Sequence, residues 1–172
     1  EIRGYRSAAE LYRLRKEEAA AGLCAGRADA LQKMLEDQWW DEEAGEFYQV
    51  KEQGGKLVHS PEMGHGLSLL YYRVLENSTQ KRKHMEKLHE YSMGQRERIN
   101  VESMSHYPEI FYSHGETEKA YYWLRELIDP KLNRREYPEV SFAVVGSYLY
   151  GAAGIRIDAP KREVTIAPAL DG

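Results

Sequence analysis

Three glutamates, Glu62, Glu102 and Glu139, recur along the chain, and each stands at the head of an apolar, helix-like segment. Their step of about 40 residues has the length of a helical hairpin rather than that of a single helix. Stacked hairpins would bring the three carboxylates to one shared polar end of their helices. Carboxylates gathered in this way can exchange protons with a ligand or accept its hydrogen bonds.

Histidines accompany two of these glutamates. His65 follows Glu62 by three residues and His106 follows Glu102 by four, so the members of each pair share a helical face. A Glu-x-x-His motif also occurs in di-iron bundles, but there is one copy here and no third ligand is evident. The lone Cys24 excludes a cysteine-based zinc site. We therefore predict neither a metal nor a cofactor.

A plain structural role is the alternative for these carboxylates. A glutamate in the first turn of a helix is stabilised by the helix dipole and by the free backbone amides at that end. This alternative stays open for Glu102 and Glu139, as does a role as general base or as acceptor of a ligand hydroxyl.

The aromatic composition favours packed helices beside a solvent-filled cleft. The chain has 13 Tyr and 3 Trp but only 3 Phe, and Tyr and Trp combine apolar area with a hydrogen-bonding tip. Sugars are one ligand class that such surfaces accept, although the tyrosines could equally rim a helical core. Because Trp39 and Trp40 are adjacent, they face different ways, so we expect one in the core and one as a sugar platform.

Length and charge limit the class of protein. The 172 residues suffice for one domain with a core. The formal net charge of −4 and the lack of a long basic run argue against a nucleic-acid partner. No apolar run approaches the ~20 residues that span a bilayer, so no membrane partner is expected. The cellular compartment stays open.

Hydrophobic periodicity predicts a mostly α-helical chain. A small β-hairpin is expected where Gly54-Gly55 joins two short alternating segments. We expect Gly22 and Gly26 to break or kink the first helix, and Ser78 or Thr79 to cap the third. Helices are predicted over residues 6–40, 61–75, 80–93, 102–114, 117–128 and 138–153, and strands over 46–50, 56–59 and 164–166.

Two kinds of helix alternate. Residues 61–75, 102–114 and 138–153 are apolar around most of their circumference, as buried helices are, whereas 80–93 and 117–128 are amphipathic. Such alternation is typical of an inner ring of helices wrapped by an outer ring. Three inner helices would make half of a six-hairpin (α/α)6 toroid. We place this helical domain at residues 1–154 and a short β-type extension at 155–172.

About two thirds of the chain resembles a known family. The segments Arg135–Phe142, Val145–Gly151, Gly154-Ile155 and Val164–Pro168, together with Trp39–Tyr48, are similar to the last part of six-hairpin glycosidases, above all α-L-rhamnosidase-like enzymes. In that family the last barrel helix leads into a C-terminal β-sandwich. This chain has Tyr137-Pro138-Glu139 where the family has a Trp-Glu pair, and the hairpin carrying the family's general acid is not evident here.

The resemblance implies an enzyme that cleaves glycosides with inversion. One glutamic acid protonates the leaving oxygen and a second carboxylate activates water. It implies a carbohydrate partner and suggests Glu139 and Glu102 as catalytic residues. The residues expected to bind substrate are Glu62, His65, His106, Tyr137 and Trp40.

Two further functional hypotheses stay open. Half a toroid exposes apolar faces of its inner helices, so the chain could instead be a non-catalytic carbohydrate-binding or self-associating module, or pack against a missing N-terminal half. A weaker alternative is a polysaccharide lyase or sugar epimerase that uses His and Tyr for proton transfer. The sugar, the linkage and the oligomeric state are not determined at this level.

Overall fold

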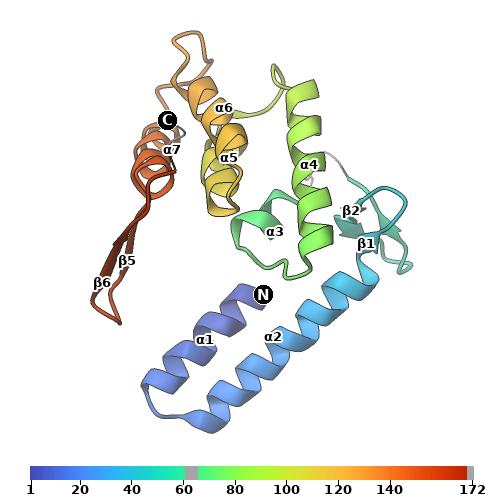
Figure 1. The fold of residues 1–172 in the computed structure, drawn as a ribbon. Helices are drawn as coiled ribbons and strands as arrows, with labels where there is room; N and C mark the ends of the chain where they lie inside the picture. Colours follow the sequence, from blue (N-terminus) through green and yellow to red (C-terminus); the bar gives the residue numbers. More distant parts are fainter. Residues whose placement is uncertain (61–65, 170–172) are drawn as a thin grey trace. The chain divides into compact units, whose positions relative to one another are not determined.

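The computed structural model describes residues 1–60 and 66–169. The protein is mostly helical with small antiparallel β-hairpins (Figure 1), as the periodicity predicts. It divides into two compact units, Glu1–Tyr91 and Ser92–Gly172, and each is described by itself.

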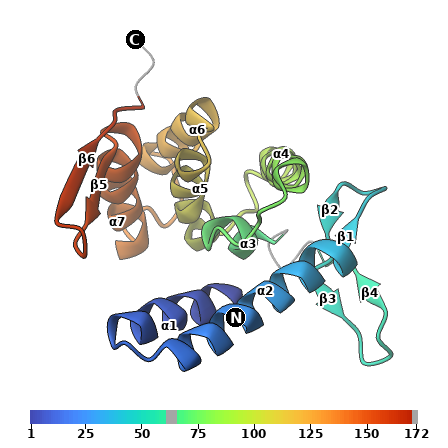
Figure 2. The same cartoon turned by 60° about the horizontal axis from the view of Figure 1, so that its bottom comes forward.

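The first unit begins with an antiparallel pair of helices, α1 (Ile2–Leu14) and α2 (Glu18–Gln38), which pack side by side (Figures 1 and 2). The predicted break at Gly22 or Gly26 is wrong, because both lie inside α2. The chain turns instead at Lys16, whose positive φ of 62° ends α1. Buried Ala9, Ala21 and Ala28 let the two helices approach closely.

Two β-hairpins follow. The first pairs β1 (Trp40–Asp41) with β2 (Glu46–Phe47), and the second pairs β3 (Val50–Lys51) with β4 (Leu57–Val58). The predicted hairpin around Gly54-Gly55 is confirmed, and Gly55 has the φ of 86° that such a turn requires. The predicted strand 46–50 is two strands, because β2 and β3 pair with different partners.

Two helices complete this unit. The start of the helix predicted at 61–75 lies outside the described residues. Its described part, α3 (Leu67–Tyr71), ends early because Arg73 has a φ of 53°. Next, α4 (Ser78–Gly94) runs from the first unit into the second. The residue at its N-terminus that binds free amides is Asn77, not Ser78 or Thr79: Asn77 Oδ1 accepts from the Thr79 and Gln80 amides at 3.1 and 3.2 Å.

The second unit has α5 (Val101–Ser113) in contact with both α6 (Thr117–Ile128) and α7 (Pro138–Gly146). The helices predicted at 102–114 and 117–128 are confirmed. Trp123 and Phe111, both 0% exposed, form the centre of the core between α5 and α6. A π-helical turn, η2 (Ser147–Ala152), continues α7.

A C-terminal hairpin closes the second unit. Here β5 (Ile155–Asp158) contacts η2 and pairs with β6 (Glu163–Ile166), so the predicted terminal strand has a partner that the sequence pattern did not indicate. Gly154 allows this return of the chain. A Cβ at Gly154 would lie 1.8 Å from the Ala167 carbonyl oxygen, so only glycine fits there.

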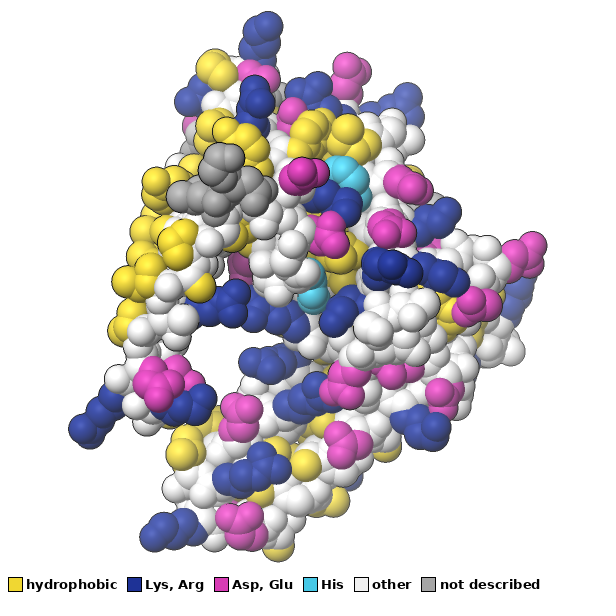
Figure 3. Space-filling view, viewed as in Figure 1, with side chains coloured by type: hydrophobic (Ala, Val, Ile, Leu, Met, Phe, Trp, Pro, Cys, Tyr) yellow, Lys and Arg dark blue, Asp and Glu magenta, His cyan; other side chains and the backbone are white. Residues whose placement is uncertain are grey.

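The apolar helix predicted at 138–153 is not buried on every side, which corrects the expectation for an inner helix. Phe142 is 76% exposed and Tyr148 is 59% exposed. Figure 3 shows hydrophobic side chains gathered along the side of α7. The physical reason is that α5 and α6 cover only one side of α7, the side on which Val140 is buried.

Candidate functional site

The N-terminal ends of α5 and α7 lie together. Asn100 Oδ1 accepts from the Ser103 amide at 2.8 Å and begins α5, which places Glu102 in its first turn. Tyr137 is the N-cap of α7, and Pro138 pre-sets the backbone of its first turn. Arg134 joins the two ends, because its Nη2 lies 3.2 Å from Glu102 Oε1 and its Cζ lies 4.0 Å over the Tyr137 ring.

Arg134 occupies an unusual backbone conformation. Its φ of 59° is in the left-handed region, which side chains with a Cβ seldom adopt. A hydrogen bond to Tyr137 raises the pKa of the Arg134 guanidinium, and the nearby Glu102 carboxylate adds to this. Arg134 therefore stays charged and holds the predicted residues Glu102 and Tyr137 at one place.

The two predicted catalytic carboxylates have different surroundings. Glu102 Oε1 pairs with Arg134, whereas Glu102 Oε2 is buried and has no hydrogen-bond partner among the described residues. Glu139 lies exposed in the first turn of α7. Within the described part of the chain, Glu139 has no ion pair or hydrogen bond through its side chain. The structure thus joins Glu102 to Tyr137, but not to Glu139 by a direct contact.

The other predicted site residues are dispersed. His106 lies half-buried on α5, one turn after Glu102. Glu62 and His65 lie outside the described residues. Trp40 belongs to the first unit, where its Nε1 donates to Glu42 Oε2 at 2.5 Å and its ring meets that of Phe47 edge-on at 4.9 Å.

The two adjacent tryptophans do not divide into one core residue and one exposed platform. Trp39 and Trp40 are both half-buried, and Trp39 lines an apolar groove together with Leu31 and Leu35. The fully buried tryptophan is Trp123. Lys83 Nζ lies over the Trp40 ring, 6.0 Å from its centroid, so another residue of the protein already contacts part of the ring surface that a sugar would need.

A second polar cluster, in the first unit, was missed from the sequence. His59 Nε2 lies 3.0 Å from Asp41 Oδ2, and His59 Nδ1 lies 3.8 Å from Glu46 Oε1. The Tyr48 ring stacks on the His59 ring at 4.4 Å. Asp41 Oδ1 accepts the Glu43 and Ala44 amides at 2.9 and 3.0 Å, which closes the turn between β1 and β2.

The electrostatics of this cluster favour a charged Asp41. The amide of Ala44, then the side chains of His59 and Tyr48, donate hydrogen bonds that hold the pKa of Asp41 well below its usual range. The run Asp41-Glu42-Glu43-Ala44-Gly45 by itself predicts the turn, but the approach of His59 depends on how the two hairpins pack.

His84 corrects a further expectation. No pattern in the sequence predicts a buried histidine at positions 59, 84, 89 or 114, and we expect these side chains on surfaces or at helix ends, yet His84 is 0% exposed. Its ring meets Phe47 edge-on at 5.3 Å, and its Nε2 lies 3.4 Å from the Gly66 carbonyl oxygen. Gly66 makes room for it, because a Cβ there would lie 2.7 Å from His84 Nε2. His114, the C-cap of α5, does lie at a helix end.

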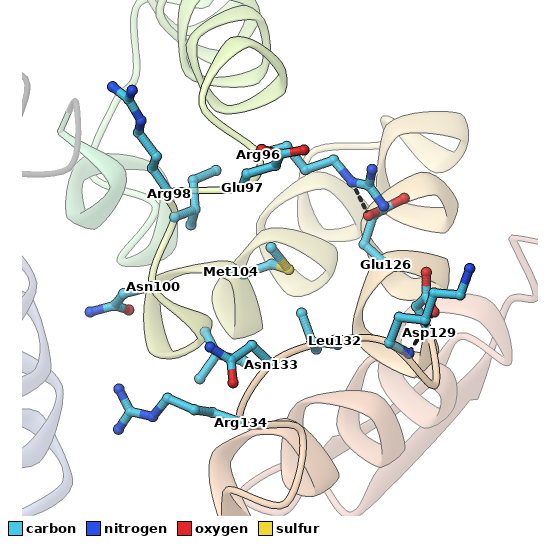
Figure 4. A pocket seen from close by; sticks show the side chains of 13 residues that line it. Arg96, Glu97, Arg98, Asn100, Met104, Glu126, Asp129, Leu132, Asn133 and Arg134 are labelled. Atoms are coloured by element: carbon cyan, nitrogen blue, oxygen red, sulfur yellow. Dashed lines mark hydrogen bonds and ion pairs between the residues drawn. The ribbon is translucent and has the colours of Figure 1, made fainter.

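A pocket of about 520 Å³ adjoins the joined ends of α5 and α7 (Figure 4). Met104 and Leu132 contribute apolar surface, and an ion pair between Arg96 and Glu126 lies along one wall. Arg134 is part of the lining, so the pocket is continuous with the Glu102–Arg134–Tyr137 contact. The lining residues are Arg96, Glu97, Arg98, Ile99, Asn100, Val101, Met104, Glu126, Asp129, Lys131, Leu132, Asn133 and Arg134.

The chain matches no protein-family model, no curated protein and no solved structure. Among residues 1–60 and 66–169, no group of three or more His, Cys, Asp or Glu side chains is arranged to hold a metal ion. Within the same ranges, every helix is too short or too polar to cross a bilayer. The site is therefore defined by its own chemistry: carboxylates, a guanidinium and a tyrosine beside a partly apolar pocket.

Proposed function

We propose that this chain is the C-terminal portion of a six-hairpin, glycoside hydrolase-like protein that cleaves glycosidic bonds in complex carbohydrate with inversion. The observation that supports it best is the shared polar end of α5 and α7, where Arg134 lies 3.2 Å from Glu102 and 4.0 Å over Tyr137. In such a toroid, inner helices whose N-termini lie at the same end would share one cleft. The side chains in their first turns would line that cleft.

Inverting hydrolysis divides the work between two carboxyl groups on opposite faces of the sugar. Glu139, which is exposed and has no counter-ion among the described residues, would act as the general base that activates water. Glu102, oriented by Arg134, would accept a hydroxyl hydrogen bond beside the reacting centre. The general acid would come from a preceding hairpin of the same toroid, in keeping with the resemblance to α-L-rhamnosidase-like enzymes.

The test uses the protein that contains all six hairpins. Glu139→Gln should abolish hydrolysis of a glycan that the unsubstituted protein cleaves, with the melting temperature unchanged because the side chain is exposed. Glu109→Gln, at an exposed position on α5, is the control and should keep full turnover. Unchanged turnover in Glu139→Gln would contradict the assignment, and an unsaturated sugar product would indicate a lyase instead.

The exposed apolar surface of α7 and η2 favours a second candidate function, a self-associating helical module without activity of its own. Phe142, Val145 and Tyr148 are 76%, 58% and 59% exposed. Patches of this kind mark interaction sites, and a second copy of the chain would cover them. Sedimentation should then show a dimer that Phe142→Ser with Tyr148→Ser converts to a monomer. A monomeric unsubstituted chain would rule this candidate out.

A further inference from the structure

We propose that β6 is a dimerisation strand, which pairs antiparallel with β6 of a second copy of this chain and joins the two hairpins into one continuous sheet. This inference rests on the self-association described above as the second candidate function. It adds a strand pairing of defined register to the exposed apolar surface of α7 and η2. Three features carry it: the composition of the hairpin surface, the outer edge of β6, and the residues that bound that edge.

The β5–β6 hairpin has one face made only of β-branched aliphatic side chains. In β5, Ile155 and Ile157 point to the same face, because side chains alternate along a strand. Across the hairpin these two residues lie opposite Ile166 and Val164, respectively. Ile157, Val164 and Ile166 are 66%, 63% and 68% exposed. A two-stranded sheet is marginally stable in water, and further strands beside such an aliphatic face stabilise it.

The outer edge of β6 is open to another strand. β5 contacts η2 and lies between β6 and α7 (Figure 2), whereas all of β6 is exposed. The Ala167 amide donates to the Gly154 carbonyl oxygen at 3.1 Å, and Thr165 is turned towards β5 in the same way, because alternate residues of an antiparallel strand bond to the same side. Val164 and Ile166 therefore point their N–H and C=O groups away from β5, which makes this edge a template for pairing.

The two ends of β6 leave one register for a symmetric pair. Val164 opposite Val164 of the second copy would place Ile166 opposite Arg162, whose φ of 56° does not fit a strand. Ile166 opposite itself would place Val164 opposite Pro168, which has no N–H to donate. The remaining register is centred on Thr165. In it Val164 of each copy lies opposite Ile166 of the other, and each such pair exchanges both of its N–H···O=C bonds.

The side chains agree with the register centred on Thr165. Val164 and Ile166 of different copies become neighbours, so the aliphatic face continues from one hairpin onto the other. Thr165 lies opposite Thr165 of the second copy, a pair that stabilises sheets. Glu163 lies opposite Ala167, so the two Glu163 carboxylates are kept apart. The edge of β6 is thus complementary to itself, which is what a two-fold symmetric dimer requires.

The test is disulfide cross-linking of the 172-residue chain in a Cys24→Ser background. Thr165→Cys should give a covalent dimer on mild oxidation. In the proposed register this residue forms a non-hydrogen-bonded pair with itself, whose Cα···Cα distance of about 4.5 Å suits a disulfide. Glu163→Cys is the matched control, because Glu163 is also exposed on β6 but lies at least about 13 Å from its own copy. It should give no covalent dimer.

Sedimentation of Ile166→Pro gives an independent measurement. The Ile166 N–H points away from β5, so proline removes bonds between the copies while the hairpin keeps its own. The dissociation constant of the dimer should rise about tenfold or more, with an unchanged circular dichroism spectrum. Ile166→Thr retains the N–H and a β-branched side chain, and it should retain most of the dimer.

Failure of Thr165→Cys to cross-link while the unsubstituted chain sediments as a dimer would overturn the pairing of β6 and leave self-association standing. Equal cross-linking of Thr165→Cys and Glu163→Cys, or equal losses in Ile166→Pro and Ile166→Thr, would have the same consequence. A monomeric unsubstituted chain would overturn both this inference and self-association, and would leave the proposed hydrolysis standing.

Discussion

His59 Nε2 lies 3.0 Å from Asp41 Oδ2 and so joins the β1–β2 hairpin to the end of the β3–β4 hairpin. Asp41 at the same time accepts the Glu43 and Ala44 amides of its own turn. One carboxylate therefore closes a turn and connects two hairpins.

Asp41→Ala should lower the urea midpoint of unfolding, because the turn amides and His59 lose their acceptor at once. Asp41→Asn should have a smaller effect, since its amide oxygen still accepts from the turn. Glu43→Ala, an exposed neighbour, should leave the midpoint unchanged. A fall as large in Glu43→Ala as in Asp41→Ala would show that the cluster does not stabilise the fold.

Acid should weaken the same contact. The folded-state pKa of Asp41 is lowered, so its contribution to stability is present above the unfolded pKa of about 3.9 and is lost as the pH falls toward the folded value. Urea midpoints measured from about pH 5 down to about pH 2 should fall less steeply in Asp41→Asn than in the unsubstituted chain. Parallel pH profiles would contradict the assignment.

Gly151→Ala should destabilise the second unit by about 2 kcal/mol through overpacking. The added Cβ would lie 2.2 Å from Tyr112 Cδ2, and Tyr112 is itself buried on α5. Gly146→Ala is the control, because a Cβ there has no atom within 4 Å and alanine favours a helix. Thermal unfolding should separate the two variants, and equal melting temperatures would show that η2 does not pack this closely on α5.

Asn77→Ala should cost about 1 kcal/mol, the usual effect of removing a helix N-cap. Asn77 Oδ1 accepts the Thr79 and Gln80 amides at the start of α4. Asn77→Asp should retain stability, since a carboxylate also accepts these bonds and suits the helix N-terminus. Denaturant unfolding of Thr79→Ala provides the comparison: a greater loss there than in Asn77→Ala would return the cap to the position first expected.

Local patterns predicted the elements of this chain well where one segment decides the outcome. The helices at 102–114 and 117–128 were found to within a residue at each end, because their apolar periodicity and their flanking Gly115 and Asp129-Pro130 act within a single helix. The sequence pattern was less informative where the structure depends on two segments of the chain that meet. Lys16, rather than Gly22 or Gly26, ends the first helix, because the left-handed residue lies where α1 and α2 reverse direction.

In the candidate site, too, features set within one segment could be predicted, whereas features that need two packed segments could not. The carboxylates at the heads of helices were visible in the sequence, since a glutamate after Asn100 or Pro138 is a local signal. The contacts of Arg134 with Glu102 and Tyr137 were not visible, because they form only when α5 and α7 are packed.

By itself, then, the sequence determined a mostly helical chain with carboxylates at the heads of two of its helices, through interactions that extend over one or two turns. Only the tertiary structure decided that Glu102 meets Tyr137 through Arg134, that His59 meets Asp41, and that Phe142 faces solvent. The physical reason is that periodicity specifies which face of a helix is apolar, whereas burial and pairing depend on which other elements cover that face.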